Sequence, residues 1–316
     1  MGRVPDFFVI GHPKCGTTAL YAMLKRHPQI YMSDVKEPQF FASDLRVLSG
    51  DERSSAGQRT LSEYMALFEA ARPDQLVGDA STRHIWSPGA AARIAAAQPA
   101  ARVIAVLREP TSFLRSLHLQ LLQNRAEDEP DLGRAIALEQ DRRAGRALTE
   151  LAASQPKLLM YAERAGYLEQ LRRYHAVFPR DQVLVLIYED FRADNERTLR
   201  QVQRFLGVDD TVPVEVLEAN PSVRRRVGLD ETVFAVTYGR SRGARMVRKT
   251  LMRLTPRRLR QEAFRTLQRS VLFGSPRPPD EELMLELRRR FKPEVQALSE
   301  YLDRDLVTLW GYEAID

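Results

Sequence analysis

The sequence is poor in cysteine and histidine and lacks any long apolar run. Cys15 is its only cysteine, so no disulfide can form within the chain. With five histidines, no group of His, Cys and carboxylates has the spacing of a metal site. No apolar stretch approaches the ~18 residues of a membrane span, and the first residues do not resemble a signal peptide. We therefore expect a cytoplasmic protein without stable membrane insertion.

No charge of one sign dominates the sequence. The 48 basic and 42 acidic residues leave a net charge of +6, which suits an anionic ligand but is also common. The basic stretches lack interleaved aromatic residues, so we expect no nucleic-acid partner. The 316 residues contain no internal repeat and no clear boundary, which favours one domain over residues 1–316. Oligomeric state cannot be read from the sequence.

The most informative stretch spans residues 7–20. Four apolar residues, Phe7 to Ile10, indicate a buried strand, and a helix is expected from Thr17 onward. The loop between them is bounded by Gly11 and Gly16. Such a strand, loop and helix N-terminus form an anion cradle, because backbone N–H groups point inward and the helix dipole adds positive charge.

The cradle departs from a nucleotide P-loop at one position. The Gly11–Gly16 spacing matches G-x-x-x-x-G-K-[ST], but Thr17 stands where that motif has lysine. The only lysine in the loop is Lys14, before the second glycine. Lys14 is therefore expected on the crown of the loop, beside the 5′ end of a nucleotide. This difference indicates a transferred group other than phosphoryl.

The loop resembles the 5′-phosphosulfate loop of sulfotransferases that use 3′-phosphoadenosine 5′-phosphosulfate (PAPS). Their pattern, Pro-Lys-(Ser, Ala or Cys)-Gly-Thr-Thr, is matched in full by Pro13, Lys14, Cys15, Gly16, Thr17 and Thr18. The string Lys-Glu-Pro-Gln-Phe-Phe at residues 36–41 resembles a segment of bacterial and carbohydrate-type members. The resemblance implies that residues 13–18 bind PAPS and its product adenosine 3′,5′-bisphosphate (PAP), without a metal.

Apolar strands alternate with helices along the chain, which predicts an α/β fold with a parallel sheet. Together with the loop, this indicates a P-loop-like fold of three layers, with helices on both sides of the central sheet. Strands are expected at 75–81, 102–107 and 183–188, and a capping box at Thr60–Glu63 opens a short helix. Residues 132–176 and the tail from Asp280 are expected to be helical, and residues 43–59 to form a mobile polar loop.

The resemblance also implies a site for the 3′-phosphate of the donor. Arg108 follows the strand at 102–107 and Ser116 lies downstream, as in the family pattern. Tyr188, at the end of the strand at 183–188, is a further candidate for donor binding. A late basic segment of about 219–260 is expected to cover the donor, with Arg224, Arg225 and Arg226 as alternative contacts.

Sulfuryl transfer is an in-line displacement that needs a base for the acceptor and a cation for the leaving group. Lys14 suits the cation, and Glu37 is the first candidate for the base, with Pro38 expected to hold it extended. Asp79 and His84 are rival bases. These two residues, with Lys36 and Ser81, are also candidates for acceptor binding. The expected acceptor is a hydroxyl or amine of a carbohydrate, glycolipid or other small molecule.

Two further functions and one side reaction remain open at this point. A P-loop kinase gains support from the glycine spacing and from the strand before Tyr188, and a non-catalytic anion-binding module would explain the basic segment. A magnesium requirement would indicate the kinase. Cys15 lies beside Lys14 and near a helix N-terminus, which favours a reactive thiolate at the centre of the cradle.

Overall fold

The computed structural model describes residues 2–45, 60–213, 224–225, 273–274 and 278–315. Most of the polar loop predicted at 43–59 lies outside the described residues. So does most of the basic segment predicted at 219–260, including Arg226. Among the helices that the structure does describe, none combines the length and apolar character required to span a bilayer.

The centre of the molecule is a parallel sheet of five strands in the order β2-β3-β1-β4-β5. Its strands are β1 (Phe7–Gly11), β2 (Ile30–Met32), β3 (Leu76–Ala80), β4 (Arg102–Leu107) and β5 (Val183–Ile187). Every residue of β1 is buried, as its run of apolar side chains predicts for a central strand. A separate antiparallel pair joins β6 (Arg224–Arg225) to β7 (Phe273–Gly274).

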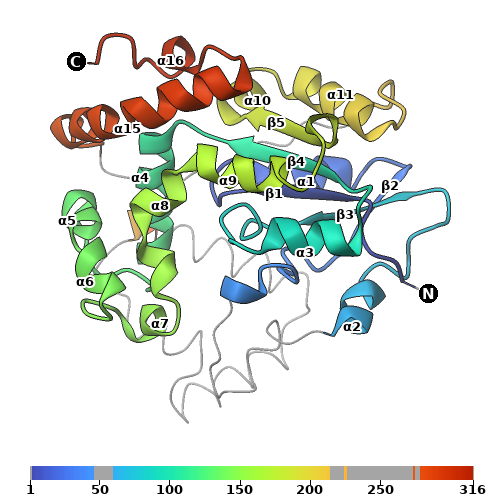
Figure 1. Cartoon of the computed structure of the whole chain (residues 1–316), viewed down its shortest axis with the longest axis horizontal. Helices are drawn as coiled ribbons and strands as arrows, with labels where there is room; N and C mark the ends of the chain where they lie inside the picture. Colours follow the sequence, from blue (N-terminus) through green and yellow to red (C-terminus); the bar gives the residue numbers. More distant parts are fainter. Residues whose placement is uncertain (1, 46–59, 214–223, 226–272, 275–277, 316) are drawn as a thin grey trace.

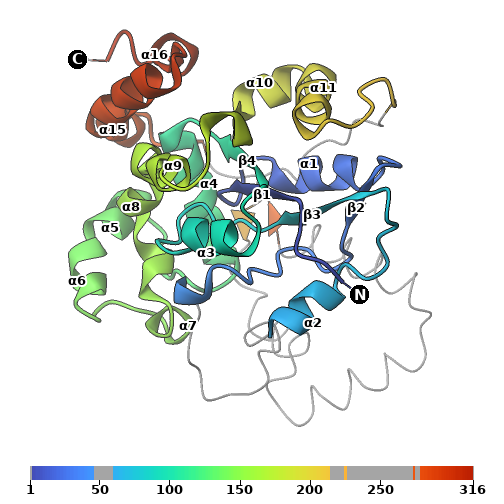
Figure 2. The ribbon, with the colours of Figure 1, turned by 45° about the vertical axis from the view of Figure 1, so that its right-hand side comes forward.

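Helices cover both faces of the sheet (Figures 1 and 2). The α-helices are α1 (Thr17–Leu24), α2 (Leu61–Ala66), α3 (Ala90–Ala97), α4 (Pro110–Gln123), α5 (Leu132–Ala137), α6 (Glu139–Arg143), α7 (Glu150–Ala153), α8 (Tyr161–Ala165), α9 (Tyr167–His175), α10 (Tyr188–Ala193), α11 (Asn195–Leu206), α15 (Glu281–Leu302) and α16 (Leu306–Leu309). Short 3₁₀ turns are η1 (Ser43–Leu45), η2 (Pro156–Leu159) and η3 (Arg180–Gln182). The α/β fold with a parallel sheet between helical layers is thus confirmed.

The order of the strands places the functional loops at one edge. The chain leaves β1 toward β3 and β2 on one side, and later adds β4 and β5 on the other. In such a sheet, ligands bind beyond the carboxyl ends of the strands, where the strand order reverses. The loops after β1, β3, β4 and β5 therefore meet where a donor and an acceptor can bind.

Capping residues in the sequence predicted the starts of two helices correctly. Thr60 and Glu63 form the expected capping box at the start of α2, and Asp280 caps α15 by accepting the Leu283 N–H. α3 begins at Ala90, and the Ser87 hydroxyl accepts the Ala90 N–H at 3.0 Å across the intervening turn.

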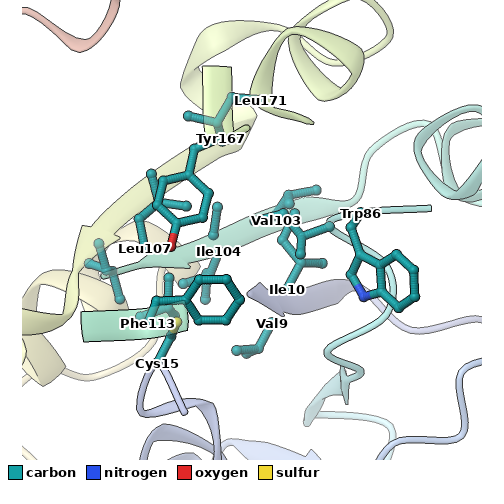
Figure 3. Close-up of a cluster of buried hydrophobic side chains, with 14 of the residues drawn as sticks. Val9, Ile10, Cys15, Trp86, Val103, Ile104, Leu107, Phe113, Tyr167 and Leu171 are labelled. Carbon is teal, nitrogen blue, oxygen red and sulfur yellow. The ribbon is translucent and has the colours of Figure 1, made fainter. Parts of the chain in front are cut away.

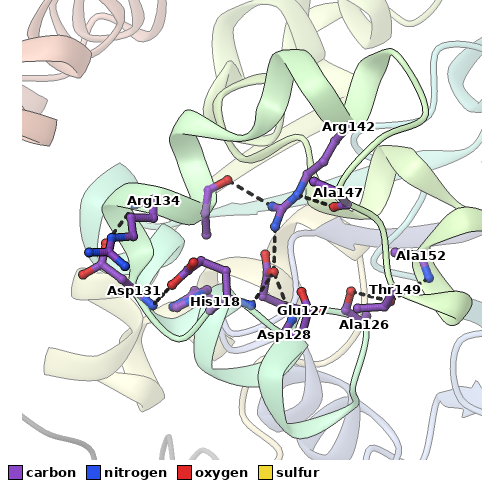
Figure 4. Close-up of polar contacts among 12 residues, drawn as sticks. His118, Ala126, Glu127, Asp128, Asp131, Arg134, Arg142, Ala147, Thr149 and Ala152 are labelled. Atoms are coloured by element: carbon purple, nitrogen blue, oxygen red, sulfur yellow. Dashed lines mark hydrogen bonds and ion pairs between the residues drawn. The ribbon is translucent and has the colours of Figure 1, made fainter.

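The helical prediction over 132–176 is only partly right, because the structure divides this region into α5 to α9 and a 3₁₀ turn. A buried ion pair connects this region to the residues after α4. Arg142 donates to Glu127 at 2.7 Å, and both side chains are fully buried (Figure 4). Glu127 also accepts the Tyr161 hydroxyl at 2.8 Å. These bonds satisfy both charges, which would otherwise be costly to bury.

Candidate functional site

The loop after β1 has the backbone of an anion cradle. Gly16 precedes α1 with φ 87°, and a Cβ there would lie 3.1 Å from the Tyr188 and Phe191 rings. Lys14 also has a positive φ, 71°, which is uncommon for a residue with a side chain. Thr17 is buried at the start of α1, while Thr18 is exposed. The helix N-terminus therefore opens onto the loop as predicted.

Arg108 ties the strand β4 to this loop. One guanidinium nitrogen donates to the Lys14 carbonyl at 2.9 Å, and the guanidinium lies over the Tyr188 ring, 4.8 Å from its centroid. The structure thus brings Lys14, Arg108 and Tyr188 together from the segments that follow β1, β4 and β5. Among the described residues, neither Lys14 nor Arg108 forms an ion pair with a carboxylate.

The electrostatics of the two cations suit a bound anion. Burial and then the charge of Arg108 lower the pKa of Lys14 below its ordinary value. Repulsion between the two cations is relieved when an anion binds between them. The buried Nε of Arg108 also lacks a hydrogen-bond partner, which leaves one donor available. These side chains therefore fit a phosphorylated and sulfated ligand.

Ser116 lies on α4, whose start is fixed by the residue after Arg108. Glu109 accepts the N–H groups of Thr111 and Ser112 at 3.0 and 2.7 Å, and the Tyr312 hydroxyl at 2.6 Å. Pro110 occupies the first helical turn. The role of Glu109 as a cap was missed, although a Glu-Pro pair after a strand is a recognisable helix start. Ser116 itself is buried.

The pair β6–β7 lies next to α4, the helix that carries Ser116. The backbone at Arg224 and Arg225 therefore lies against the helix that follows Arg108. Arg226 and the rest of the predicted covering segment lie outside the described residues.

Glu37 lies at the exposed side of the cradle. Its carboxylate accepts Lys36 Nζ at 2.7 Å, and the same ammonium donates to Thr18 Oγ1 at 3.0 Å. Thr82 Oγ1 donates to Glu37 at 3.2 Å. Lys36 and Glu37 are both partly exposed, so the carboxylate retains access to solvent and is linked to the first turn of α1 by one side chain. Thr82 was not among the predicted residues.

The expected extended backbone at Glu37 is wrong. Its φ is 56°, in the left-handed region, and Gln39 has φ 53°. The proline after Glu37 disfavours the right-handed helical region, but the extended alternative is not adopted because tertiary hydrogen bonds hold the segment. Gln39 N donates to Ser81 Oγ at 3.0 Å, for example.

The rival bases lie deeper in the protein than Glu37. Asp79 is 1% exposed and accepts the Tyr64 and Ser81 hydroxyls at 2.7 and 2.6 Å. Burial raises the pKa of Asp79 to about 6. His84 is fully buried with its ring against Phe8 and Phe41. A base must reach an acceptor from solvent, so the geometry favours Glu37 over both.

Cys15 does not have the environment that was expected. The thiol is fully buried beneath Phe113 and among side chains of β4 and α9 (Figure 3). Burial raises the pKa of Cys15 to about 12, against the opposing effect of Arg108. The expectation of a reactive thiolate was therefore wrong: apolar packing outweighs the nearby positive charge.

Two further buried side chains, those of His12 and Arg164, lie close to the loop after β1. The His12 ring is buried against Phe113 and Tyr167, with Nε2 at 2.9 Å from Gln170 Oε1. Arg164 on α8 is 2% exposed, stacks over Trp86, and pairs with no carboxylate among the described residues. Burial and Arg83 lower the pKa of Arg164 to about 10. No sequence pattern pointed to this buried cation.

Residues 5–212 match the sequence model of the sulfotransferase family. The chain belongs to the sulfotransferase family. It is 30% identical over 210 residues to human bifunctional heparan sulfate N-deacetylase/N-sulfotransferase 3, covering 65% of this chain and 22% of that protein. It is 28% identical over 252 residues to mouse carbohydrate sulfotransferase 15, covering 65% of this chain and 44% of that protein. The chain thus spans less than half the length of these relatives.

A solved structure supports the same fold for this chain. The sulfotransferase of Alicyclobacillus acidocaldarius superposes with a TM-score of 0.67 at 26% identity, covering 97% of this chain and 98% of that one. The family assignment favours sulfuryl over phosphoryl transfer, in agreement with the absence of a lysine after Gly16. Within the described part of the chain, no cluster of His, Cys and carboxylate side chains could hold a metal ion.

Proposed function

We propose that this sulfotransferase moves a sulfuryl group from PAPS to a hydroxyl or amine of a carbohydrate acceptor. The observation that carries the proposal is the position of Lys36, whose ammonium bonds both Thr18 of the loop and the Glu37 carboxylate. A solvent-accessible carboxylate is thereby held beside an anion cradle. Carbohydrate acceptors are favoured because the similar human and mouse proteins are named for heparan sulfate and carbohydrate sulfation.

The residues of the cradle fit the anionic donor. Backbone N–H groups at the start of α1 and the Lys14 ammonium would hold the phosphosulfate, while Arg108 and Ser116 would hold the 3′-phosphate. Bound PAPS supplies the activated sulfuryl group. Lys14 stabilises negative charge on the leaving oxygen, and its lowered pKa reflects a partly desolvated ammonium. The positive charges of Lys14 and Arg108 therefore favour the donor over a neutral ligand.

Glu37 then removes the proton from the acceptor. A base must lie within hydrogen-bond reach of the attacking group, and Glu37 is the least buried of the three candidate bases. Lys36 and Thr82 orient the carboxylate through bonds to separate oxygens.

We also propose that the reaction needs no metal ion and that the protein is cytoplasmic. The cationic side chains around the loop support the first point, and the single cysteine supports the second.

Transfer of radiolabelled sulfuryl from PAPS tests this function. The acceptors are desulfated heparan oligosaccharides, compared with a simple phenol, each assayed with and without a chelator. We expect labelled oligosaccharide in both conditions. A parallel assay with ATP should give no phosphorylated product. Heparin retention that persists in Lys14→Ala, with no transfer by the wild type to either acceptor, would instead support the non-catalytic anion-binding module.

A further inference from the structure

The turn that carries Glu37 has an unusual backbone. Glu37 and Gln39 both have positive φ values, 56° and 53°, on either side of Pro38. Residues with side chains seldom adopt this region, and they remain there only when surrounding contacts compensate for the strain. The orientation of Glu37 therefore depends on what holds residues 37–39.

A buried hydrogen-bond chain fixes the end of this turn. Gln39 N donates to Ser81 Oγ at 3.0 Å, and Ser81 donates to Asp79 at 2.6 Å. Tyr64 donates to the other oxygen of Asp79 at 2.7 Å. Because Asp79 belongs to β3, the chain connects the turn to the central sheet.

Tyr64 holds the same segment through its ring. It stacks on Phe40 with centroids 4.5 Å apart and planes 9° from parallel, and meets Phe41 edge-on at 5.4 Å. Offset stacking and edge contacts of this kind add to the apolar burial. Tyr64 thus restrains residues 39–41 twice, once through Asp79 and Ser81 and once through the aromatic pair.

We propose that Ser81, oriented by Asp79 and Tyr64, is a positioning residue that aims Glu37 at the acceptor; this rests on the proposed function. Ser81 and Asp79 were candidates for acceptor contact, but their side chains are 0% and 1% exposed. Their polar atoms are occupied by one another, by Gln39 and by Tyr64. They act on the reaction through the backbone of the turn.

Ser81→Ala removes the hydroxyl with the smallest change in volume. We expect turnover with PAPS and the desulfated heparan acceptor to fall by about 10- to 10²-fold, the scale of a small misplacement of a reacting group. Affinity for PAP should not change. Hydrogen exchange at residues 37–41 should become faster, since Gln39 N–H loses its acceptor. Unchanged turnover and unchanged exchange would overturn the proposal.

Ser87→Ala is the matched control. Ser87 lies in the same loop, is 1% exposed, and its hydroxyl bonds Asp44 at 2.6 Å and the Ala90 N–H at 3.0 Å. It contributes no bond to residues 37–39. Its loss should lower the melting temperature while turnover stays near that of the wild type. Equal losses of turnover in the two variants would show a general loss of structure and overturn the positioning role.

A double-mutant cycle separates this proposal from the assignment of the base. If Ser81 acts through Glu37, Ser81→Ala should have no further effect on turnover in Glu37→Gln. Multiplicative losses would show that Ser81 acts independently and would overturn the positioning role. Full activity of Glu37→Gln alone would show that the assignment of the base is wrong. Should Ser81→Ala fail to fold, Tyr64→Phe, which keeps the ring stack and removes only the bond to Asp79, takes its place in the cycle.

Discussion

Lys36 joins Glu37 to the donor loop: its ammonium lies 2.7 Å from the Glu37 carboxylate and 3.0 Å from Thr18 Oγ1. The two partners come from segments that are separate in sequence, the first turn of α1 and the turn after β2. This bridge places a candidate base beside an anion cradle without burying it.

Lys14→Ala should lower turnover by ~10²–10³-fold, the usual loss when one donor to a developing charge is removed. PAP should bind only somewhat more weakly, because the backbone N–H groups and Arg108 remain. The measurement is single-turnover sulfuryl transfer together with PAP titration. Lys157→Ala is the control, since Lys157 is exposed on η2. Turnover near the wild-type rate would show that Lys14 does not stabilise the leaving group.

Arg108→Ala and Ser116→Ala should weaken PAP selectively over adenosine 5′-phosphate, which lacks the 3′-phosphate. Loss of a charged hydrogen bond corresponds to about 10- to 10²-fold in affinity, and Arg108 should show the larger effect. Calorimetric titration of both nucleotides measures the difference. Arg134→Ala, at an exposed arginine of α5, should change neither affinity. If both nucleotides weaken equally, the two residues only support the loop.

Cys15 should resist thiol reagents in the native protein. It is 0% exposed and burial raises its pKa to about 12, so thiolate is scarce at neutral pH. Labelling with a chromogenic disulfide reagent should be slow at pH 7.5 and rapid in denaturant. Because the chain has one cysteine, the signal is unambiguous. Rapid native labelling that abolishes PAP binding would contradict the buried position.

Asp79 should make stability fall as the pH rises. Its folded pKa is raised from 3.8 to about 6 by burial, so the folded state retains a proton that the unfolded state releases. The contribution of Asp79 to the free energy of unfolding is therefore greatest below about pH 4 and is lost through pH 6, by up to ~3 kcal/mol at ~1.4 kcal/mol per pKa unit.

The non-titrating variant Asp79→Asn removes this dependence. Its free energy of unfolding, relative to the wild type, should increase between pH 4.5 and 7.5 in denaturant titrations. Asp74→Asn is the control, because hydrogen bonding to Arg72 lowers the pKa of exposed Asp74, so its relative stability should not increase over this range. A difference for Asp79→Asn that stays flat with pH would show that Asp79 is ionised throughout.

Local patterns predicted the elements that depend on neighbouring residues. The strand at 102–107 and the capping box at Thr60 were correct to the residue, and the loop at 13–18 lies where a strand ends and a helix begins. These features follow from apolar runs, caps and glycines, which act over a few residues.

Features that depend on tertiary contacts could not be predicted. The burial of Cys15 depends on Phe113 and on side chains of distant strands, and the left-handed Glu37 depends on partners such as Thr82 and Ser81. The sequence offered both Glu37 and Asp79 as candidate bases, with Glu37 first. Only the fold shows one exposed to solvent and the other buried in β3.

The most direct test of the account is single-turnover sulfuryl transfer by Glu37→Gln at saturating PAPS and acceptor, with PAP affinity measured on the same preparation. Glutamine keeps the shape of the side chain and cannot take the proton. We predict normal PAP binding and a loss of ~10²-fold or more in transfer, the usual contribution of a positioned base. Full transfer by Glu37→Gln, with Asp79→Asn or His84→Ala inactive but still able to bind PAP, would contradict the account and move the base to the loop after β3.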